Sequence, residues 1–198
     1  IGLMQTPYQP EVQSAMVQTS GLEAVALALS QDLIRTVQRI RTFFSGPELD
    51  AVALILRSYD VHNVKAILRS LGKHLPAADT LTTLLPIGNL PEAVLAMLAD
   101  APDTGAAIDL LASMRVPLAK PLLRLRSEKP GADIADMELA LERWHLLDAF
   151  EQLEPVPRSG DILSSTMEME ADLVNLLTVI RLTHAPVERT ALVRRLET

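Results

Sequence analysis

Apolar residues recur at steps of three and four along most of this chain, which is the spacing of amphipathic α-helices. In residues 21–44 the apolar positions of one predicted face are Leu22, Val25, Leu29, Leu33, Val37 and Ile40. Ser20 is a candidate cap for this helix, and the Ser-Gly-Pro run at residues 45–47 ends it. Glu48 and Asp50 place negative charge in the first turn of a second helix, which we expect to reach about residue 71.

Proline and glycine divide the rest of the chain into shorter helices. We expect helices at residues 79–85, 91–99, 104–114, 117–126 and 133–153, a long helix between Asp161 and Pro186, and the start of another at 187–196. The Leu-Leu-Pro-Ile-Gly run at residues 84–88 is expected to be a packed connector. No run alternates apolar and polar residues well enough to predict a strand. The predicted fold class is all-α, built from repeated units of antiparallel helices.

One helical stretch occurs twice. The sequence SYDVHNVKAILRS at residues 58–70 returns in looser form as EADLVNLLTVIRL at residues 170–182. Apolar and polar positions repeat together, which indicates that the chain repeats a structural unit. The residues assigned to this repeat motif are Tyr59, Asp60, Asn63, Lys65 and Arg69 in the first copy and Asp172, Asn175 and Arg181 in the second.

Helical geometry places the motif residues around the helix. At about 100° per residue, Asp60 points into the apolar arc, Asn63 lies at its edge, and Lys65 and Arg69 lie on the far, wet side. Asp172 has the same place in the second copy. A buried carboxylate needs a partner, so we expect each aspartate to bond a neighbouring helix end or a cation. Such a contact would set helix register, and the alternative is direct contact with a partner protein.

Composition limits the classes of protein that remain. The 198 residues are 48% hydrophobic but only 3% aromatic, which suits helix packing through aliphatic side chains. A net charge of -7 argues against a nucleic-acid surface and favours a basic protein partner. No cysteine is present, which fits a reducing compartment, so we expect a cytoplasmic protein, and no apolar run reaches the roughly 20 residues that cross a bilayer. The first residue is Ile and no signal region follows, so we expect an internal piece of a longer chain.

Catalytic, cofactor and metal sites are not predicted. His62, His74, His145 and His184 lie in different segments and lack metal-ligand spacing. The glycines are isolated, and neither a P-loop nor a dinucleotide fingerprint occurs. A small helical enzyme would need a pocket with converging acid, base or metal ligands, so we expect a non-catalytic protein.

The first motif copy and its connector resemble a known family. YDVHNVKAILR at residues 59–69, followed by LLPIGNL at residues 84–90, is similar to the C subunit of V/A-type ATPases and ATP synthases, which is related to the vacuolar ATPase d subunit. Residues 3–8 and 138–153 agree with the same family. The resemblance implies a rotor part, in which three similar helical units form a funnel. The funnel sits on the membrane proteolipid ring and receives the axle subunits of the central stalk during ion transport, proton transport included.

The resemblance also implies that the repeated Asp and Asn mark successive units and are not catalytic. Two copies are present where three units are expected, so we predict a fragment or a shortened member. We assign residues 1–155 to the first unit and the connecting helices, and residues 156–198 to the second motif and the start of a further unit. A partial funnel exposes apolar faces, which favours self-association. The alternative function is a generic helical adaptor that binds a protein in a groove.

Overall fold

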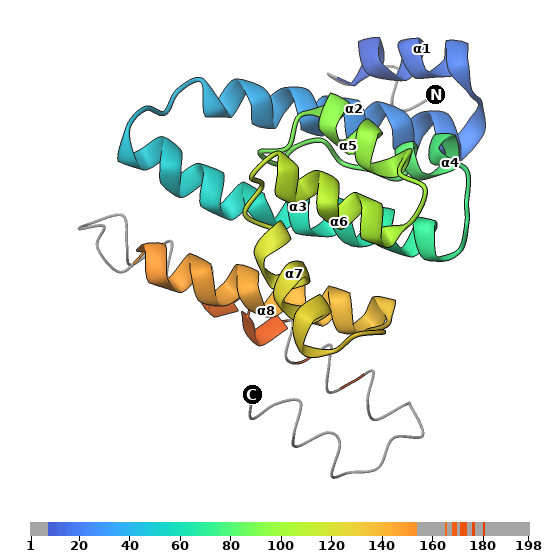
Figure 1. The fold of residues 1–198 in the computed structure, drawn as a ribbon. Coiled ribbons are helices and arrows are strands. Elements are labelled where there is room, and N and C mark those ends of the chain that lie inside the picture. Colours follow the sequence, from blue (N-terminus) through green and yellow to red (C-terminus); the bar gives the residue numbers. More distant parts are fainter. Residues whose placement is uncertain are drawn as a thin grey trace. The chain divides into compact units, whose positions relative to one another are not determined.

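The computed structural model describes residues 8–153 and, beyond them, residues 165, 168, 169, 171–173, 176 and 180. The described residues form helices, turns and connecting segments without a strand, which confirms the all-α prediction (Figure 1). The chain divides into two compact units, Ile1–His145 and Leu146–Thr198. The boundary expected after residue 155 stays a prediction.

Most helices begin and end near the residues that the sequence pattern indicated. Their bounds are α1 Gln9–Gln18, α2 Gly21–Arg41, α3 Pro47–Gly72, α4 Ala77–Leu81, α5 Glu92–Ala99, α6 Thr104–Ser113, α7 Ala119–Glu128 and α8 Ile134–Leu153. Pro47 starts α3 without losing a helical hydrogen bond. Asp103 caps α6 by accepting a hydrogen bond from the N–H of Ala106 at 2.8 Å. Ser20 is the N-cap residue of α2, but its side chain makes no capping bond.

The helix α2 packs through a different face from the predicted one. Its buried residues are Ala24 and Ala28, which contact Val12 and Ala15 of α1. Leu22, Leu29, Leu33 and Ile40 of the expected core stripe are instead 88%, 45%, 40% and 44% exposed. Small residues allow two helices to approach closely, so the alanines and not the leucines form the contact with α1. The helix α1 itself was not predicted.

The main core of the first unit surrounds α3. Val64, Ile67 and Leu68 are almost completely buried and pack with apolar residues of α5, α6 and α7, among them Leu95, Ile108, Leu111 and Leu122. Figure 1 shows α5 and α6 beside α3. The prediction that Asp60 faces this core is confirmed, since its exposure is 2%. Asn63, expected at the edge of the apolar arc, is completely buried at 0%.

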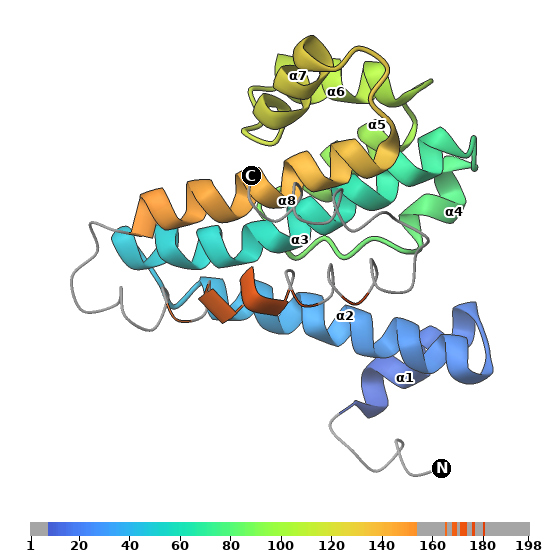
Figure 2. The same ribbon diagram turned by 90° about the horizontal axis from the view of Figure 1, so that it is seen from below.

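The first part of α8 runs alongside α3 in Figure 2 and adds Leu141 to the same core. Arg69 binds Glu138, with Nη2 to Oε2 at 2.6 Å, and Lys65 forms an ion pair with Glu142. The expectation that Lys65 and Arg69 face only water is therefore wrong for Lys65, whose side chain is 15% exposed, and only partly right for Arg69 at 49%. Both cations have carboxylate partners, and this allows a charged helix face to pack against another helix.

Arg57 extends the same contact toward the end of the first unit. Its Nε donates to Nδ1 of His145 at 3.1 Å, and its Nη2 donates to the His145 carbonyl at 3.2 Å. The guanidinium lies 4.7 Å from the centre of the Trp144 ring, a cation–π distance. Trp144 is itself packed against the main core.

Candidate functional site

The candidate site is the segment that joins α4 to α5, residues 82–91, called the connector below. Its apolar residues Leu84, Ile87 and Leu90 are buried at 8%, 1% and 9% exposure. This confirms the expected packing. Because a non-helical segment has backbone N–H and C=O groups with no helical partners, burying it requires other groups to satisfy them. The repeat-motif residues of α3 supply those groups.

Asn63 holds the first part of the connector. Its Nδ2 donates to the Leu85 carbonyl at 2.7 Å, and its Oδ1 accepts from the Leu85 N–H at 2.8 Å. The amide side chain thus pairs with one residue as a neighbouring strand would. This two-point contact uses the amide NH2 as donor and the amide oxygen as acceptor at once, so the side chain pairs with Leu85 as a peptide group would.

Asp60 holds the second part, one helical turn before Asn63. Its Oδ2 accepts from the Asn89 N–H at 2.8 Å and its Oδ1 accepts from the Leu90 N–H at 2.9 Å. The prediction that this carboxylate is hydrogen-bonded is confirmed. Its partners lie in the connector just before α5, and not in the first turn of that helix. Asp60 and Asn63, with the connector they hold, are called the clamp below.

The electrostatic state of Asp60 reflects its burial. Removal from water raises the pKa of this carboxyl above its ordinary value, while the Leu90 and Asn89 hydrogen bonds and the nearby charge of Arg41 oppose part of the rise. The carboxylate is also very close to Gly88, where a β-carbon would lie 2.0 Å from Oδ1. The clamp therefore requires glycine at residue 88, because any side chain would occupy the space of the carboxylate.

Two further residues complete the site, and neither belonged to the predicted motif. Asn89 donates from Nδ2 to the Ala53 carbonyl at 2.8 Å. Arg41, at the end of α2, donates from Nη1 to the Gly88 carbonyl at 2.9 Å and lies 3.5 Å from Oδ1 of Asn89. Gly88 and Asn89 follow Arg41 at separations of 47 and 48 residues, and no sequence pattern relates positions so far apart. By contrast, the four-residue spacing shared by Lys65 and Arg69 and by Glu138 and Glu142 was a usable signal for the α3–α8 ion pairs.

The remaining motif residues do not form a second clamp in the described part of the chain. Tyr59 is half-buried on α3. Asp172 is helical and exposed, unlike Asp60, so its predicted place in an apolar core is not observed. Asn175 and Arg181 lie outside the described residues, as do residues 187–196. The equivalence of the two copies stays a prediction.

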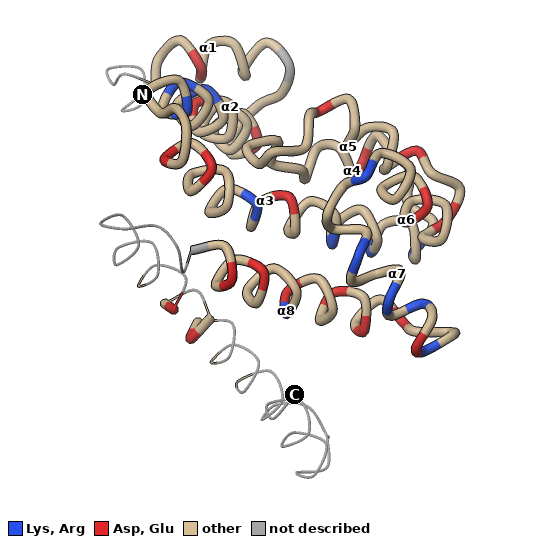
Figure 3. The backbone as a smooth tube through the Cα atoms, turned by 60° about the vertical axis from the view of Figure 1, so that its left-hand side comes forward, with Lys and Arg blue, Asp and Glu red and all other residues tan. Residues whose placement is uncertain are grey.

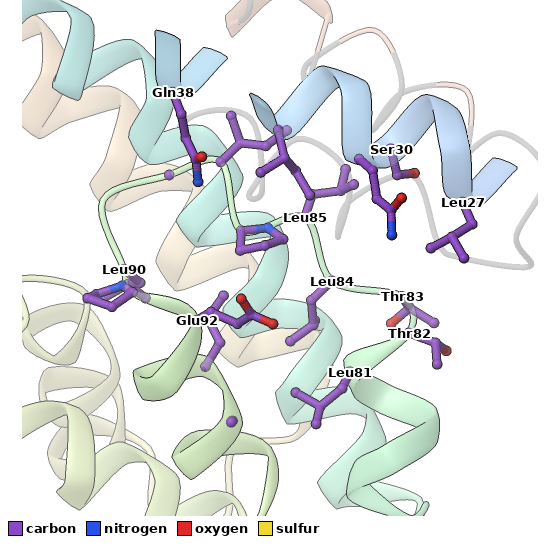
Figure 4. A pocket seen from close by; sticks show the side chains of 18 of the residues that line it. Leu27, Ser30, Gln38, Leu81, Thr82, Thr83, Leu84, Leu85, Leu90 and Glu92 are labelled. Atoms are coloured by element: carbon purple, nitrogen blue, oxygen red, sulfur yellow. The ribbon is translucent and has the colours of Figure 1, made fainter. Parts of the chain in front are cut away.

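A groove of about 1040 Å³ runs between α2 and the connector. Figure 4 shows Leu27, Ser30 and Gln38 of α2 on one wall, with Leu84, Leu85 and Leu90 among the residues of the other. Its lining mixes apolar, amide, hydroxyl and charged groups, the last from Glu23, Arg41 and Glu92. Among the described residues, no group of three or more His, Asp or Glu side chains could hold a metal ion.

Positions of both charge signs occur along the described helices in Figure 3. Several are paired, as in Arg124 with Glu128 at 2.7 Å, Arg126 with Asp109 at 2.8 Å and Lys129 with Asp136 at 2.5 Å. The basic residues near α7 are thus balanced in part by neighbouring carboxylates. Within the part of the chain that the structure describes, no helix has the length and apolar character to span a bilayer.

Comparisons with a family profile and with individual proteins point to the same family. The profile of a family described as ATP synthase (C/AC39) subunit matches residues 2–194. The C subunit of the A-type ATP synthase of Methanosarcina acetivorans is 27% identical over 190 residues, which are 95% of this chain and 51% of that protein. The C subunit of the V-type ATP synthase of Deinococcus radiodurans is 28% identical over 88% of this chain and 49% of its own length. The chain spans about half the length of the curated relatives it matches.

Proposed function

Because the chain belongs to the ATP synthase (C/AC39) subunit family, we propose that it is a non-catalytic central-stalk subunit of a rotary V/A-type ATPase or ATP synthase. In this role it couples the axle subunits to the membrane proteolipid ring during ion transport. It works in the cytoplasm, peripheral to the membrane, and reaches the bilayer through the complex. Neither a cofactor nor a metal belongs to this role.

The observation that carries the proposal is the family match through residues 2–194, which includes the whole clamp. The geometry of the clamp supports a mechanical role. Both carboxylate oxygens of Asp60 and both polar atoms of Asn63 bind the backbone of the connector. These side chains fix one segment against another, and a subunit that transmits torque needs segments that keep their positions under load.

Co-purification tests the proposed assembly. The natural protein that carries this chain is tagged in its own cells, membranes are solubilised in a mild detergent, and bound proteins are identified by mass spectrometry against an untagged strain. We expect axle and proteolipid-ring subunits to be enriched together. Enrichment of an unrelated protein without either class would support the helical adaptor and contradict the rotary assignment.

A second measurement tests coupling in the assembled complex. Asn63→Ala removes both bonds to Leu85, whereas Ser113→Ala alters an exposed residue at the end of α6 and is the matched control. We expect membrane vesicles with the Asn63 variant to lose much of their ATP-driven ion uptake relative to the Ser113 variant. Equal uptake in the two variants, at equal amounts of subunit in the membrane, would contradict a coupling role for the clamped unit.

A further inference from the structure

The helices α1 and α2 form a small body of their own. Val12, Ala15, Ala24 and Ala28 make a buried cluster, and all of its described members belong to these two helices. Glu11 of α1, which is 5% exposed, forms an ion pair with Arg35 of α2. The packed small residues and the ion pair fix the orientation of α1 relative to α2. The two helices would therefore move together.

This body has few attachments to the rest of the first unit. Among the described residues, the main core around α3 contains none from α1 or α2. The groove of about 1040 Å³ separates α2 from the connector along much of the helix, with Leu27 and Ile34 lining one wall. A packed interface would fix the angle between the two bodies, and here the groove takes the place of such packing.

The segment that joins the two bodies is a turn with little packing. Residues 42–46 follow α2 and precede α3, and within them Phe43 is 74% exposed and Phe44 39% exposed. Gly46 has φ of +58° and ψ of -141°, and an added β-carbon there would meet nothing within 4 Å. A glycine in open space can change its backbone angles without a clash, which is what a hinge residue requires.

One side chain crosses from the α1–α2 body to the connector. Between residues 9–41 and residues 47–145, the hydrogen bonds that the structure describes come from Arg41, at 2.9 Å to the Gly88 carbonyl and 3.5 Å to Asn89. The connector that receives these bonds is itself fixed by Asp60, which binds the N–H groups of Asn89 and Leu90. Arg41 therefore reaches from a loosely attached body to a firmly held one.

We infer that α1 and α2 form a hinged arm, which turns about residues 42–46 and is held in its observed position by Arg41. Release of the Gly88 carbonyl by Arg41 frees the arm and changes the width of the groove beside the connector. The arm moves as one body because its small core and the Glu11–Arg35 pair stay intact. This movement belongs to the chain itself and does not depend on the rotary assignment.

Distance measurements between spin labels test the hinge in the whole chain. The sequence has no cysteine, so single labels can be placed without removing native thiols. One cysteine pair, Thr36→Cys with Ser113→Cys, joins exposed positions on α2 and α6 and reports the angle of the arm. A second pair, Gln13→Cys with Thr36→Cys, lies within the arm and reports its rigidity.

Each pair is measured in the parent chain, in Arg41→Ala and in Arg39→Ala, which removes an exposed arginine from the same helix turn. We expect Arg41→Ala to add a longer α2–α6 distance population while the distance within the arm stays the same. Arg39→Ala should match the parent for both pairs. The inference is overturned if Arg41→Ala matches Arg39→Ala for the α2–α6 pair, or if the distance within the arm broadens to the same degree.

Discussion

Asp60 is a buried carboxylate whose acceptors are satisfied by backbone N–H groups of the connector. Moving a carboxylate out of water costs several kcal/mol unless hydrogen bonds or charges replace the lost hydration. Here the Asn89 and Leu90 amides do so, with Arg41 adding positive charge nearby. The same bonds fix residues that enter α5. Asp60 thus holds the connector in place immediately before the next helix.

Asp60→Ala should strongly destabilise the fold, because the buried N–H groups of Asn89 and Leu90 would lose their acceptors. We expect a loss of about 2–4 kcal/mol in the free energy of unfolding. Urea unfolding followed by circular dichroism measures it. Asp172→Ala is the matched control, since Asp172 is exposed, and it should change stability by less than about 0.5 kcal/mol. Equal losses in the two variants would contradict the assignment of a structural bond network to Asp60 alone.

Arg41→Ala should raise the pKa of Asp60 further, because the positive charge of Arg41 lowers it. The folded chain already binds the Asp60 proton more tightly than the unfolded chain. The stabilisation from this proton is therefore present below the ordinary pKa of 3.8 and is lost as pH rises through the raised value. Carbon NMR of the Asp60 carboxyl against pH should show the upward change in Arg41→Ala and none in Arg39→Ala. A lower pKa in Arg41→Ala would exclude this electrostatic coupling.

At the scale of elements, apolar spacing predicted the helices well where proline, glycine and a wide apolar stripe coincide. The bounds of α3 and α8 follow from such signals. The packing face of α2 could not be predicted this way, because it depends on Ala24 and Ala28 meeting α1, and alanine contributes little to an apolar stripe. The inward position of Asp60 followed from helix geometry. Arg41 did not, because its contact with Gly88 depends on how the chain folds back between distant segments.

The ion pairs between α3 and α8 should contribute more than an ion pair within one exposed helix. Lys65 and Glu142 are 15% and 25% exposed, whereas Arg124 and Glu128 of α7 are 78% and 59% exposed. Double-mutant cycles with alanine should give a coupling free energy of about 1 kcal/mol for the first pair and a smaller one for the second. Raising the salt concentration to about 1 M should weaken the coupling within α7 more than the coupling between α3 and α8, because exposed charges are screened more strongly. Unfolding measured at low and at high salt gives both values. Equal coupling free energies would mean that the α3–α8 contact does not shield its charges from water and salt.

At the scale of the whole molecule, the two motif copies differ in their surroundings among the described residues. Asp60 is 2% exposed and binds the amides of Asn89 and Leu90, whereas Asp172 is helical and exposed. A shared sequence pattern therefore does not by itself place two helices in the same environment, because burial depends on the segments packed against each helix. The structural equivalence of the two copies stays a prediction.

The exposed stripe of α2, formed by Leu22, Leu29, Leu33 and Ile40, should make the isolated chain self-associate. Contiguous apolar surface that meets water is stabilised when a second copy covers it, at about 25 cal/mol for each Å² buried. Sedimentation equilibrium should show a mean mass that rises with protein concentration. The double variant Leu29→Gln with Leu33→Gln should show a smaller rise, because both changes lie in the stripe. Met97→Gln, at a residue of α5 that is 48% exposed, should behave as the parent. A parent chain that stays monomeric throughout would show that the stripe alone does not drive association.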